Sequence, residues 1–561
     1  MKSIFSDARK RAKRENCMPE NLRNTDRLQR EYRLPVRLVL TEGAVEGAEL
    51  LLRTAAEQVG LGEHSYAHLR GKCRIVLDFG QEMRGGLRVV AARGTEGVPM
   101  RLRLGESVNE CLSEIGRKGS TNNHALRDIT VPLPMLSDQS FFDSGFRFAC
   151  IDFPAEETDV LLRAVNAVSV GSGRAQIGSF VCSDPLVNQI YDVAARTVQL
   201  CSAETIWDGI KRDRLVWVGD LYPEIASLLT LCADDGCVTR SLDFVKDETP
   251  LPRWMNDFPM YSMWWIIILD EYYRLTGNAQ YILEQKEYYE KLIRQIDGCI
   301  AENGDFDFGM NFVDWPTHEQ PDEPEGVRSL CKLCARSGRN LEALYGTAGG
   351  VAARIEEKLS RKGAEVIEKK QIVALKYLSG TPLSGRERAI LTEGGARGFS
   401  TFMSYFLLTA LSEVGGDEAA LSAMKEYYGG MLAMGATSFW EDFDVEWMQG
   451  AVCPIDRAAR PGEKDIHGDF GRYCYVGYRH SLCHGWSAGV IPFLVKHVLG
   501  VRVEEAGYRK VRIEPRLGGL EYVDAAIPTP HGVLRVHCRK EGGRTVVRAE
   551  APAGVEVIAA E

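Results

Sequence analysis

The chain of 561 residues contains no apolar run of about 18 residues, the length that a membrane-spanning helix requires. Its most apolar stretch, 264–269, is short and ends at Asp270. Residues 1–10 carry charges where a secretory signal needs a hydrophobic segment. We therefore expect a cytoplasmic protein with no membrane partner.

Motifs for common cofactors are also missing. There is no P-loop, no dinucleotide-binding glycine pattern after a predicted strand, and no HExxH pair. The fifteen cysteines are scattered and odd in number, which indicates reduced, buried thiols rather than a disulfide framework. Cys331 and Cys334 form a single CxxC without two further ligands at matching spacing. We expect neither a cofactor nor a metal.

The charge balance has no basic excess. The chain has 68 Lys and Arg against 78 Asp and Glu, so its net charge is −10. This value argues against a nucleic-acid partner and is compatible with a neutral substrate and an acidic cleft. The length predicts two to four domains. A homo-oligomer is compatible with the sequence, which does not fix the oligomeric state.

The N-terminal part shows the pattern of a β domain. We expect a charged arm or helix over 1–33 and a β-sandwich over 34–178, because short segments there alternate in period two between turn residues. Glycines at 79–86 suggest a hairpin turn, and 47–60 has a helical pattern.

A helical domain is predicted over 179–499. Asp184 followed by Pro185 is typical of a helix start, and amphipathic segments then follow one another with short breaks. About a dozen helices in antiparallel pairs fit this pattern. Strands return over 500–561, between prolines and glycines, and predict a small C-terminal β-sandwich.

The most informative stretch is 208–220. It combines three carboxylates, two arginines and Trp217 around two glycines. Spaced carboxylates beside an indole suit sugar chemistry, in which one acid protonates a leaving oxygen and the sugar stacks on an aromatic face. The alternative is a solvated Asp/Arg turn at the start of a helix.

This stretch resembles the signature D-x-x-x-R-E-x-x-x-W-x-G-D of bacterial α-L-rhamnosidases of glycoside hydrolase family 78. Gly-Ala-Thr-Ser-Phe-Trp-Glu at 435–441 is similar to the G-A-T-T-x-W-E of that family. Ser-Leu-Cys-His-Gly-Trp-Ser at 481–487 is similar to its S-L-x-H-x-W-S, and 312–316 is also family-like. The resemblance implies an (α/α)6 six-hairpin barrel flanked by N-terminal and C-terminal β-sandwich domains.

The resemblance also implies catalytic roles. The general acid maps onto Asp213 and the general base onto Glu441, with inversion of configuration. Asp442, Asp444 and Glu446 are chemical alternatives for the base. The family has Glu where this chain has Asp213, and the shorter side chain withdraws the carboxyl by about 1.5 Å. Either the loop lies closer to the sugar, or activity is altered. Cationic neighbours favour an ionised carboxylate, whereas a general acid must carry a proton.

Ten further residues are candidate substrate contacts, from the motifs and from aromatic chemistry. They are Asp208, Arg212, Trp217, Asp220, Trp264, Asp314, Trp315, Trp440, His484 and Trp486. Helix capping for Asp220, charge neutralisation for Arg212, and core packing for each tryptophan are the structural alternatives.

The expected function is release of terminal α-L-rhamnose from an oligosaccharide or glycoside. Two alternatives stay open. One is a six-hairpin glycosidase for another glycone, and the other is a carbohydrate-binding relative that has lost turnover. The natural substrate, linkage and aglycone do not follow from the sequence.

Overall fold

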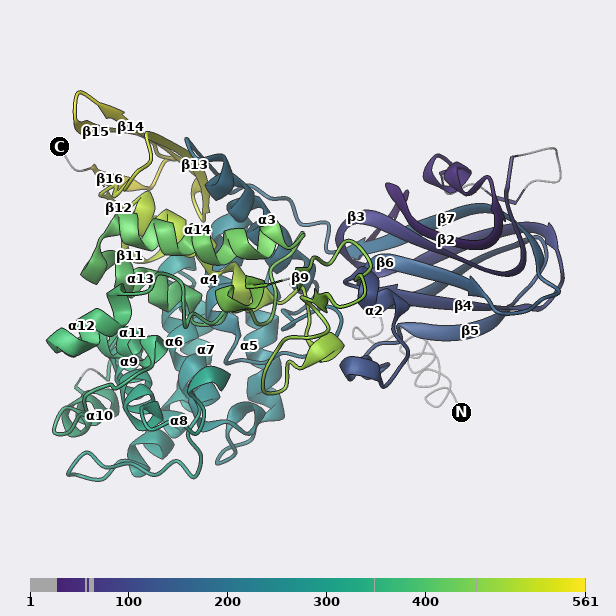
Figure 1. Ribbon diagram of the computed structural model, residues 1–561. Helices are drawn as coiled ribbons and strands as arrows, with labels where there is room; N and C mark the ends of the chain where they lie inside the picture. The colour runs from purple at the N-terminus through teal and green to yellow at the C-terminus, as the bar shows by residue number, and fades with distance from the viewer. Residues whose placement is uncertain (1–27, 56–57, 60–64, 348, 451, 560–561) are drawn as a thin grey trace, which may run out of the picture.

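A computed structural model of the chain describes residues 28–55, 58–59, 65–347, 349–450 and 452–559. A β domain on one side joins a larger helical body, and a second, smaller β region lies against the helices near the C-terminus (Figure 1). Of the expected N-terminal arm, residues 1–27 lie outside the described residues.

The N-terminal β domain is one hydrogen-bonded antiparallel sheet. Its order is β1-β7-β3-β6-β4-β5, with β2 paired to β3. The strands are β1 (Gln29–Arg33), β2 (Arg37–Glu46), β3 (Ala67–Gly94), β4 (Val98–Gly105), β5 (Asp128–Leu133), β6 (Ser137–Phe153) and β7 (Asp159–Gly171). Alternating side chains such as Leu77, Leu102 and Phe146 bury completely and form the core of the domain.

The expected hairpin at 79–86 is wrong, because β3 runs through it. Between Asp78 and Met83 the strand advances five residues while its partner β6 advances two, from Phe148 to Phe146. The extra residues form a bulge, and Gly80, with φ 83°, supplies the left-handed conformation that a bulge needs. The helical pattern at 47–60 gives only a short 3-10 helix, Ala48–Leu52, and part of that range is not described.

The helical body contains twelve α-helices between residues 185 and 433 of the described chain. They are α3 (Pro185–Cys201), α4 (Leu221–Leu231), α5 (Cys237–Glu248), α6 (Pro259–Thr276), α7 (Ala279–Glu284), α8 (Lys286–Gly298), α9 (Glu323–Tyr345), α10 (Val351–Leu359), α11 (Lys370–Leu378), α12 (Gly385–Thr392), α13 (Ser404–Gly415) and α14 (Asp417–Ala433). The predicted start of α3 is confirmed, since the Asp184 side chain accepts a hydrogen bond from the Leu186 amide at 2.9 Å. None of the described helices is long and apolar enough to cross a membrane.

The CxxC pair lies inside α9. Cys331 and Cys334 are both fully buried, because residues three apart share one face of a helix and this face packs into the core. All fourteen cysteines of the described chain are unpaired.

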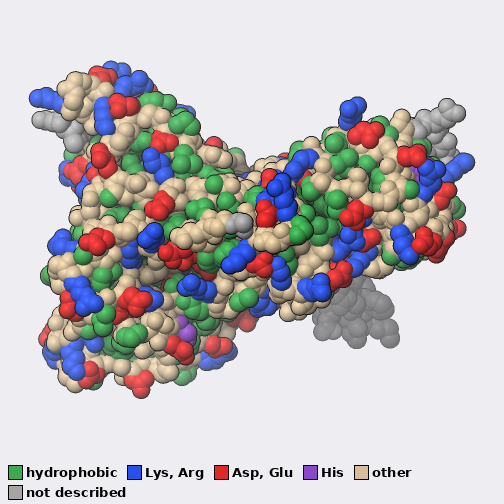
Figure 2. All heavy atoms as spheres, in the orientation of Figure 1, with side chains coloured by type: hydrophobic (Ala, Val, Ile, Leu, Met, Phe, Trp, Pro, Cys, Tyr) green, Lys and Arg blue, Asp and Glu red, His purple; other side chains and the backbone are tan. Residues whose placement is uncertain are grey.

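The C-terminal region forms two small sheets, β11-β12-β16 and β15-β14-β13-β8. Their strands are β11 (Val501–Glu505), β12 (Lys510–Ile513), β13 (Tyr522–Thr529), β14 (Gly532–Glu541), β15 (Arg544–Glu550) and β16 (Glu556–Ala559). Strand β8 (Ser179–Cys182) comes from the segment before the helices and pairs antiparallel with β13. The first residues of the range 179–499 therefore lie in the C-terminal sheet. On the face drawn in Figure 2, basic and acidic side chains intermingle over all three regions.

Candidate active site

The segment 208–220 is a loop between α3 and α4 that folds back on itself. Asp208 closes it, because its amide donates to the Leu215 carbonyl at 3.1 Å and its Oδ1 accepts from the Leu215 amide at 2.9 Å. At its tip Asp213 and Arg214 have φ values of 55° and 57°, a left-handed conformation that is uncommon outside glycine. Such a conformation persists where the surrounding contacts impose it, often at functional sites.

Backbone hydrogen bonds join this loop to the other two sequence blocks. The Gly485 amide donates to the Asp208 carbonyl at 2.8 Å, and the His484 amide donates to the Phe439 carbonyl at 3.0 Å. The Glu441 amide donates to the Ser481 carbonyl at 3.0 Å. Three segments that are far apart in the sequence therefore form one structural unit.

Arg212 contacts both candidate catalytic carboxylates. Its Nη1 lies 3.0 Å from Asp213 Oδ2, and its Nη2 forms an ion pair with Glu441 Oε1. Its Nε donates to the Arg479 carbonyl at 3.0 Å, which fixes the plane of the guanidinium. The Ser481 amide donates to the second Glu441 oxygen at 2.9 Å. Each carboxylate oxygen of Glu441 thus accepts a hydrogen bond. Because Arg212 contacts both Asp213 and Glu441, it holds the two acids close to one another.

A cavity of about 90 Å³ opens at this point. Nine of the twelve predicted site residues line it, namely Asp208, Arg212, Asp213, Trp217, Asp220, Trp315, Glu441, His484 and Trp486. The lining of the cavity combines carboxylates with indole rings. Such walls suit a ring that presents hydroxyls at its edge and C–H groups on its face.

Burial sets the charge state of the groups around the cavity. It raises the pKa of the Glu441 carboxyl, an effect that the neighbouring Arg212 opposes. Burial also raises the pKa of Asp208 and of Asp220 well above the usual range of a carboxyl. It lowers the pKa of His484 well below that of a free histidine, so this imidazole is neutral. Burial thus favours the neutral forms of these carboxyls and of the imidazole.

Three predicted contacts do not line this cavity. Trp264 is buried on α6 and packs against Tyr222 and Phe406, where it borders a separate cavity of about 450 Å³. Trp440 is 1% exposed and packs edge-on against Phe443. Both tryptophans are therefore packed in the core, which was the structural alternative to a substrate contact.

Asp314 is the third of these residues, and it has a structural role in the cavity wall. It is buried, accepts a hydrogen bond from Ser400 Oγ, and caps the turn of Trp315 through the Trp315 amide at 2.8 Å. Asp314 therefore holds a wall residue in place rather than facing the cavity itself.

Four further lining residues lie outside the predicted set: Phe258, Tyr261, Cys474 and Tyr475. The Tyr261 hydroxyl donates to Asp220 Oδ1 at 3.2 Å, which links α6 to the loop. A Cβ on Gly219 would collide with the Tyr261 ring, so the Gly219 position requires glycine. Phe258 could have been found as an aromatic residue that precedes Pro259 at the start of a helix. Cys474 and Tyr475 could have been found in the Tyr/Cys-rich stretch at 473–478.

Residues 485–489 read Gly-Trp-Ser-Ala-Gly, the spacing of a hydrolase nucleophile elbow. The structure does not support that role. The segment is a 3-10 helix without a preceding strand, and Ser487 is fully buried with its hydroxyl donating to the His484 carbonyl at 2.6 Å.

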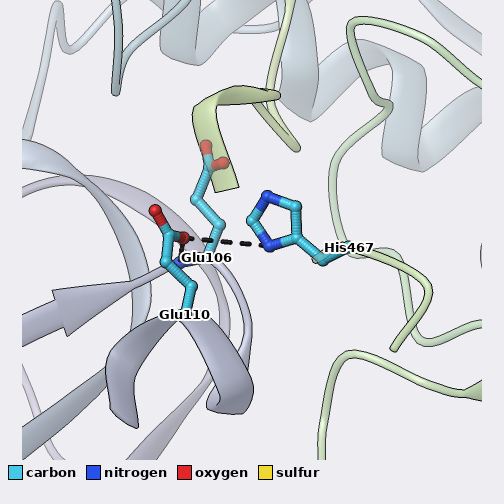
Figure 3. A group of neighbouring side chains, drawn as sticks. All are labelled: Glu106, Glu110 and His467. Atoms are coloured by element: carbon cyan, nitrogen blue, oxygen red, sulfur yellow. Dashed lines mark hydrogen bonds and ion pairs between the residues drawn. The ribbon is translucent and has the colours of Figure 1, made fainter. Parts of the chain in front are cut away.

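The N-terminal β domain places two buried carboxylates directly behind the site. Glu106, just before α2 (Val108–Leu112), and Glu110, within α2, lie close to His467 of the helical body (Figure 3). These three residue types can hold a metal ion. Lys211 Nζ, however, lies 2.9 Å from Glu106 and 3.1 Å from Glu110, so its ammonium group supplies the positive charge there.

Two segments of the chain match models of known protein domains. Residues 175–334 match the model of the bacterial alpha-L-rhamnosidase 6 hairpin glycosidase domain, and residues 500–558 match that of the bacterial alpha-L-rhamnosidase C-terminal domain. The chain therefore contains two domains of the bacterial α-L-rhamnosidase type. No curated protein sequence matches it.

Solved rhamnosidase structures share the fold. The family 78 rhamnosidase of Bacillus sp. GL1 superposes with a TM-score of 0.72 at 23% identity, over 91% of this chain and 55% of that one. A rhamnosidase of Klebsiella oxytoca with rhamnose bound gives 0.64 at 18% identity, over 85% and 96%. The α-L-rhamnosidase of Streptomyces avermitilis complexed with L-rhamnose gives 0.65 at 16%, over 95% and 50%. This chain thus spans little more than half of the first of these proteins.

Proposed function

We propose that this protein is a glycoside hydrolase that releases terminal α-L-rhamnose from an oligosaccharide or glycoside. The observation that carries the proposal is that Asp213 and Glu441 line one cavity and share the guanidinium of Arg212. The two matching domain models and the common fold with rhamnosidases support it.

In the proposed mechanism Asp213 is the general acid. Its carboxyl gives a proton to the glycosidic oxygen as the bond to the anomeric carbon breaks. Glu441 is the general base and takes a proton from the water that attacks the opposite face, so that the configuration inverts. Inverting enzymes separate these carboxyls by about 6.5–9.5 Å, and a guanidinium that contacts both limits how far apart they can lie. The raised pKa of Glu441 makes its carboxylate a better base than a free one.

The aromatic and polar walls would fix the sugar. Trp217, Trp315 and Trp486 offer faces for the C–H groups and the methyl group of a deoxy sugar. Asp208, Asp220 and His484 offer buried partners for its hydroxyls. Glycosidases for other glycones and a carbohydrate-binding relative without turnover remain the alternatives.

The proposal includes the finer architecture. The helices close into an (α/α)6 barrel within 179–499, β-sandwich domains over 34–178 and 500–561 flank it, and β8 joins the C-terminal one. The (α/α)6 barrel places the cavity where helix-connecting loops gather, which agrees with the loop positions of 208–220 and 435–441.

Turnover of p-nitrophenyl α-L-rhamnopyranoside tests the function, and a panel of other aryl glycosides serves as the comparison. We expect the rhamnoside to be the preferred substrate, and Asp213→Asn and Glu441→Gln to lower kcat by about 100-fold to 10,000-fold. Proton NMR during hydrolysis should show β-L-rhamnose as the first product. Preference for a different glycone would favour the first alternative. Sugar binding without turnover on any aryl glycoside would favour the second.

A further inference from the structure

The loop that connects α2 to β5 extends from the N-terminal β domain to the cavity. Lys118 Nζ lies 2.6 Å from Asp469 Oδ1 of the helical body. A Cβ on Gly119 would lie 2.7 Å from the Val476 carbonyl oxygen, so the two backbones are in close contact. The position of this loop over the site is therefore fixed by an ion pair and by backbone packing.

Asn122 gives the loop a defined shape. Its Oδ1 accepts hydrogen bonds from the amides of Arg127 at 3.0 Å and Asp128 at 3.1 Å, and its Nδ2 donates to the Asp128 carbonyl at 3.0 Å. Within this turn His124 has a φ of 70°. The imidazole is thus presented from a constrained backbone, as is the carboxyl of Asp213.

His124 faces the candidate acid. Its Nε2 lies 3.4 Å from Asp213 Oδ1, the oxygen opposite the one that Arg212 contacts. The His124 side chain is 32% exposed and that of Asp213 is 18% exposed. Both side chains of the pair are therefore partly open to solvent.

We propose that His124 is a positioning residue for Asp213 that also returns a proton to it after each turnover. This inference rests on the proposed function. In the general-acid step the Asp213 carboxyl gives its proton to the leaving oxygen and becomes a carboxylate. The imidazolium Nε2–H of His124 then passes its proton to Oδ1, and the neutral imidazole regains a proton from the solvent, which receives the proton that Glu441 took from the attacking water. Histidine is suited to this exchange because its ring ordinarily gains and loses a proton between pH 5 and 8.

Asp213 of this pair has a cationic neighbour on its own loop and acidic neighbours across the cavity. Arg212 contacts Asp213 from the loop, while Asp208, Asp220 and Glu441 act on it across the cavity. Arg214, the next residue, points away, because its guanidinium binds the Asp143 carbonyl at 2.7 Å and the Asp143 carboxylate at 3.0 Å. The His124 ring pairs with Asp213.

His124→Ala and His124→Gln test the inference, with His68→Ala as the matched control. His68 belongs to the same domain, is 29% exposed and also pairs with an aspartate, Asp159, at 2.6 Å. The rate of rhamnoside hydrolysis is measured from pH 4.5 to 8, with and without added imidazole. We expect both His124 variants to lose about 10-fold in kcat, less than a full acid–base group contributes.

The loss should grow as pH rises, so that the alkaline limb of the kcat profile moves to lower pH, and imidazole should restore much of the rate of His124→Ala. His68→Ala should match the wild type. A wild-type kcat profile in His124→Ala, or a loss that imidazole does not relieve, would overturn the inference and leave the proposed function intact. Failure of the wild-type protein to hydrolyse any aryl glycoside would instead remove the proposed function.

Discussion

The ammonium group of Lys211 lies 2.9 Å from the carboxylate of Glu106, and neither side chain is more than 8% exposed. Lys211 also donates to the His480 carbonyl at 2.6 Å, and Glu106 accepts from the Leu482 amide at 2.6 Å. The pair thus ties the N-terminal β domain to the two segments that carry Arg212 and the Ser481 amide. The geometry of the cavity depends on the contact between the domains.

Lys211→Met should destabilise the protein strongly, because it leaves the buried Glu106 without its cation and leaves Glu110 with only Arg127, at 3.8 Å. Breaking a buried pair in this way costs about 3–5 kcal/mol. Calorimetry should show a clear fall in Tm. Lys291→Met is the control, since Lys291 and Glu287 form an exposed pair on α8 worth about 0.3–0.5 kcal/mol. Equal Tm values for the two variants would contradict the assigned role of Lys211.

Asp213→Glu decides between the two explanations of the shorter acid. If the loop is built around aspartate, with Arg212 and His124 facing its two oxygens, the added methylene displaces the carboxyl by about 1.5 Å. We then expect a loss of about 100-fold in kcat on the rhamnoside. A gain in kcat would show instead that aspartate is a weakened acid. Asp192→Glu, at an exposed position on α3, should leave kcat unchanged.

Gly219→Ala should reduce activity through Tyr261. The new Cβ would push against the Tyr261 ring, whose hydroxyl holds Asp220 at 3.2 Å. Overpacking of this kind costs about 1–3 kcal/mol and shifts the neighbouring cavity wall. We expect a higher KM for the rhamnoside and a lower Tm. Gly298→Ala, at the end of α8 with no atom within 4 Å of the new Cβ, should preserve both values. Unchanged kinetics in Gly219→Ala would disprove the clash.

Asp314→Asn should change how stability depends on pH. Burial raises the pKa of Asp314 to about 6, against about 3.9 for a free aspartate. The folded state therefore binds its proton more tightly, and the wild type loses stability as pH rises from about 4 to about 6. Asparagine does not titrate.

The Tm advantage of the wild type over Asp314→Asn should therefore shrink across that range and stay constant above pH 7. The upper limit of the change is about 3 kcal/mol, at 1.36 kcal/mol per pKa unit. Tm measured from pH 4 to 8 checks this, and exposed Asp307→Asn should show the wild-type slope. A pH-independent difference between Asp314→Asn and the wild type would exclude the titration of Asp314.

Sequence patterns predicted the elements whose signals are local. The cap of α3 at Asp184 follows from a side chain and a proline at fixed positions. The stretch 208–220 stood out because it combines charged residues with a tryptophan, and the blocks 435–441 and 481–487 were found through their resemblance to family motifs; together they supply most of the cavity wall. Their meeting through Gly485 and Asp208 follows only from the fold.

Other features depend on tertiary packing, which no local pattern records. Trp264 belongs to an apolar stretch that is buried on every side, so its spacing could not distinguish a cavity wall from the core. The bulge in β3 has the same glycines as a hairpin turn, and only pairing with β6 tells them apart. His124 lies in another domain, in a loop without a recognisable motif, and only the domain contact brings it to Asp213.

The pairing of β8 with β13 has a consequence for synthesis on the ribosome. Tyr522, where β13 begins, follows Cys182, where β8 ends, by 340 positions. During translation β8 must wait, with Phe180 and an unfilled strand edge uncovered, until β13 has emerged. Shortened versions that stop before β13 would keep that edge open permanently, and we expect them to aggregate rather than yield an isolated helical domain.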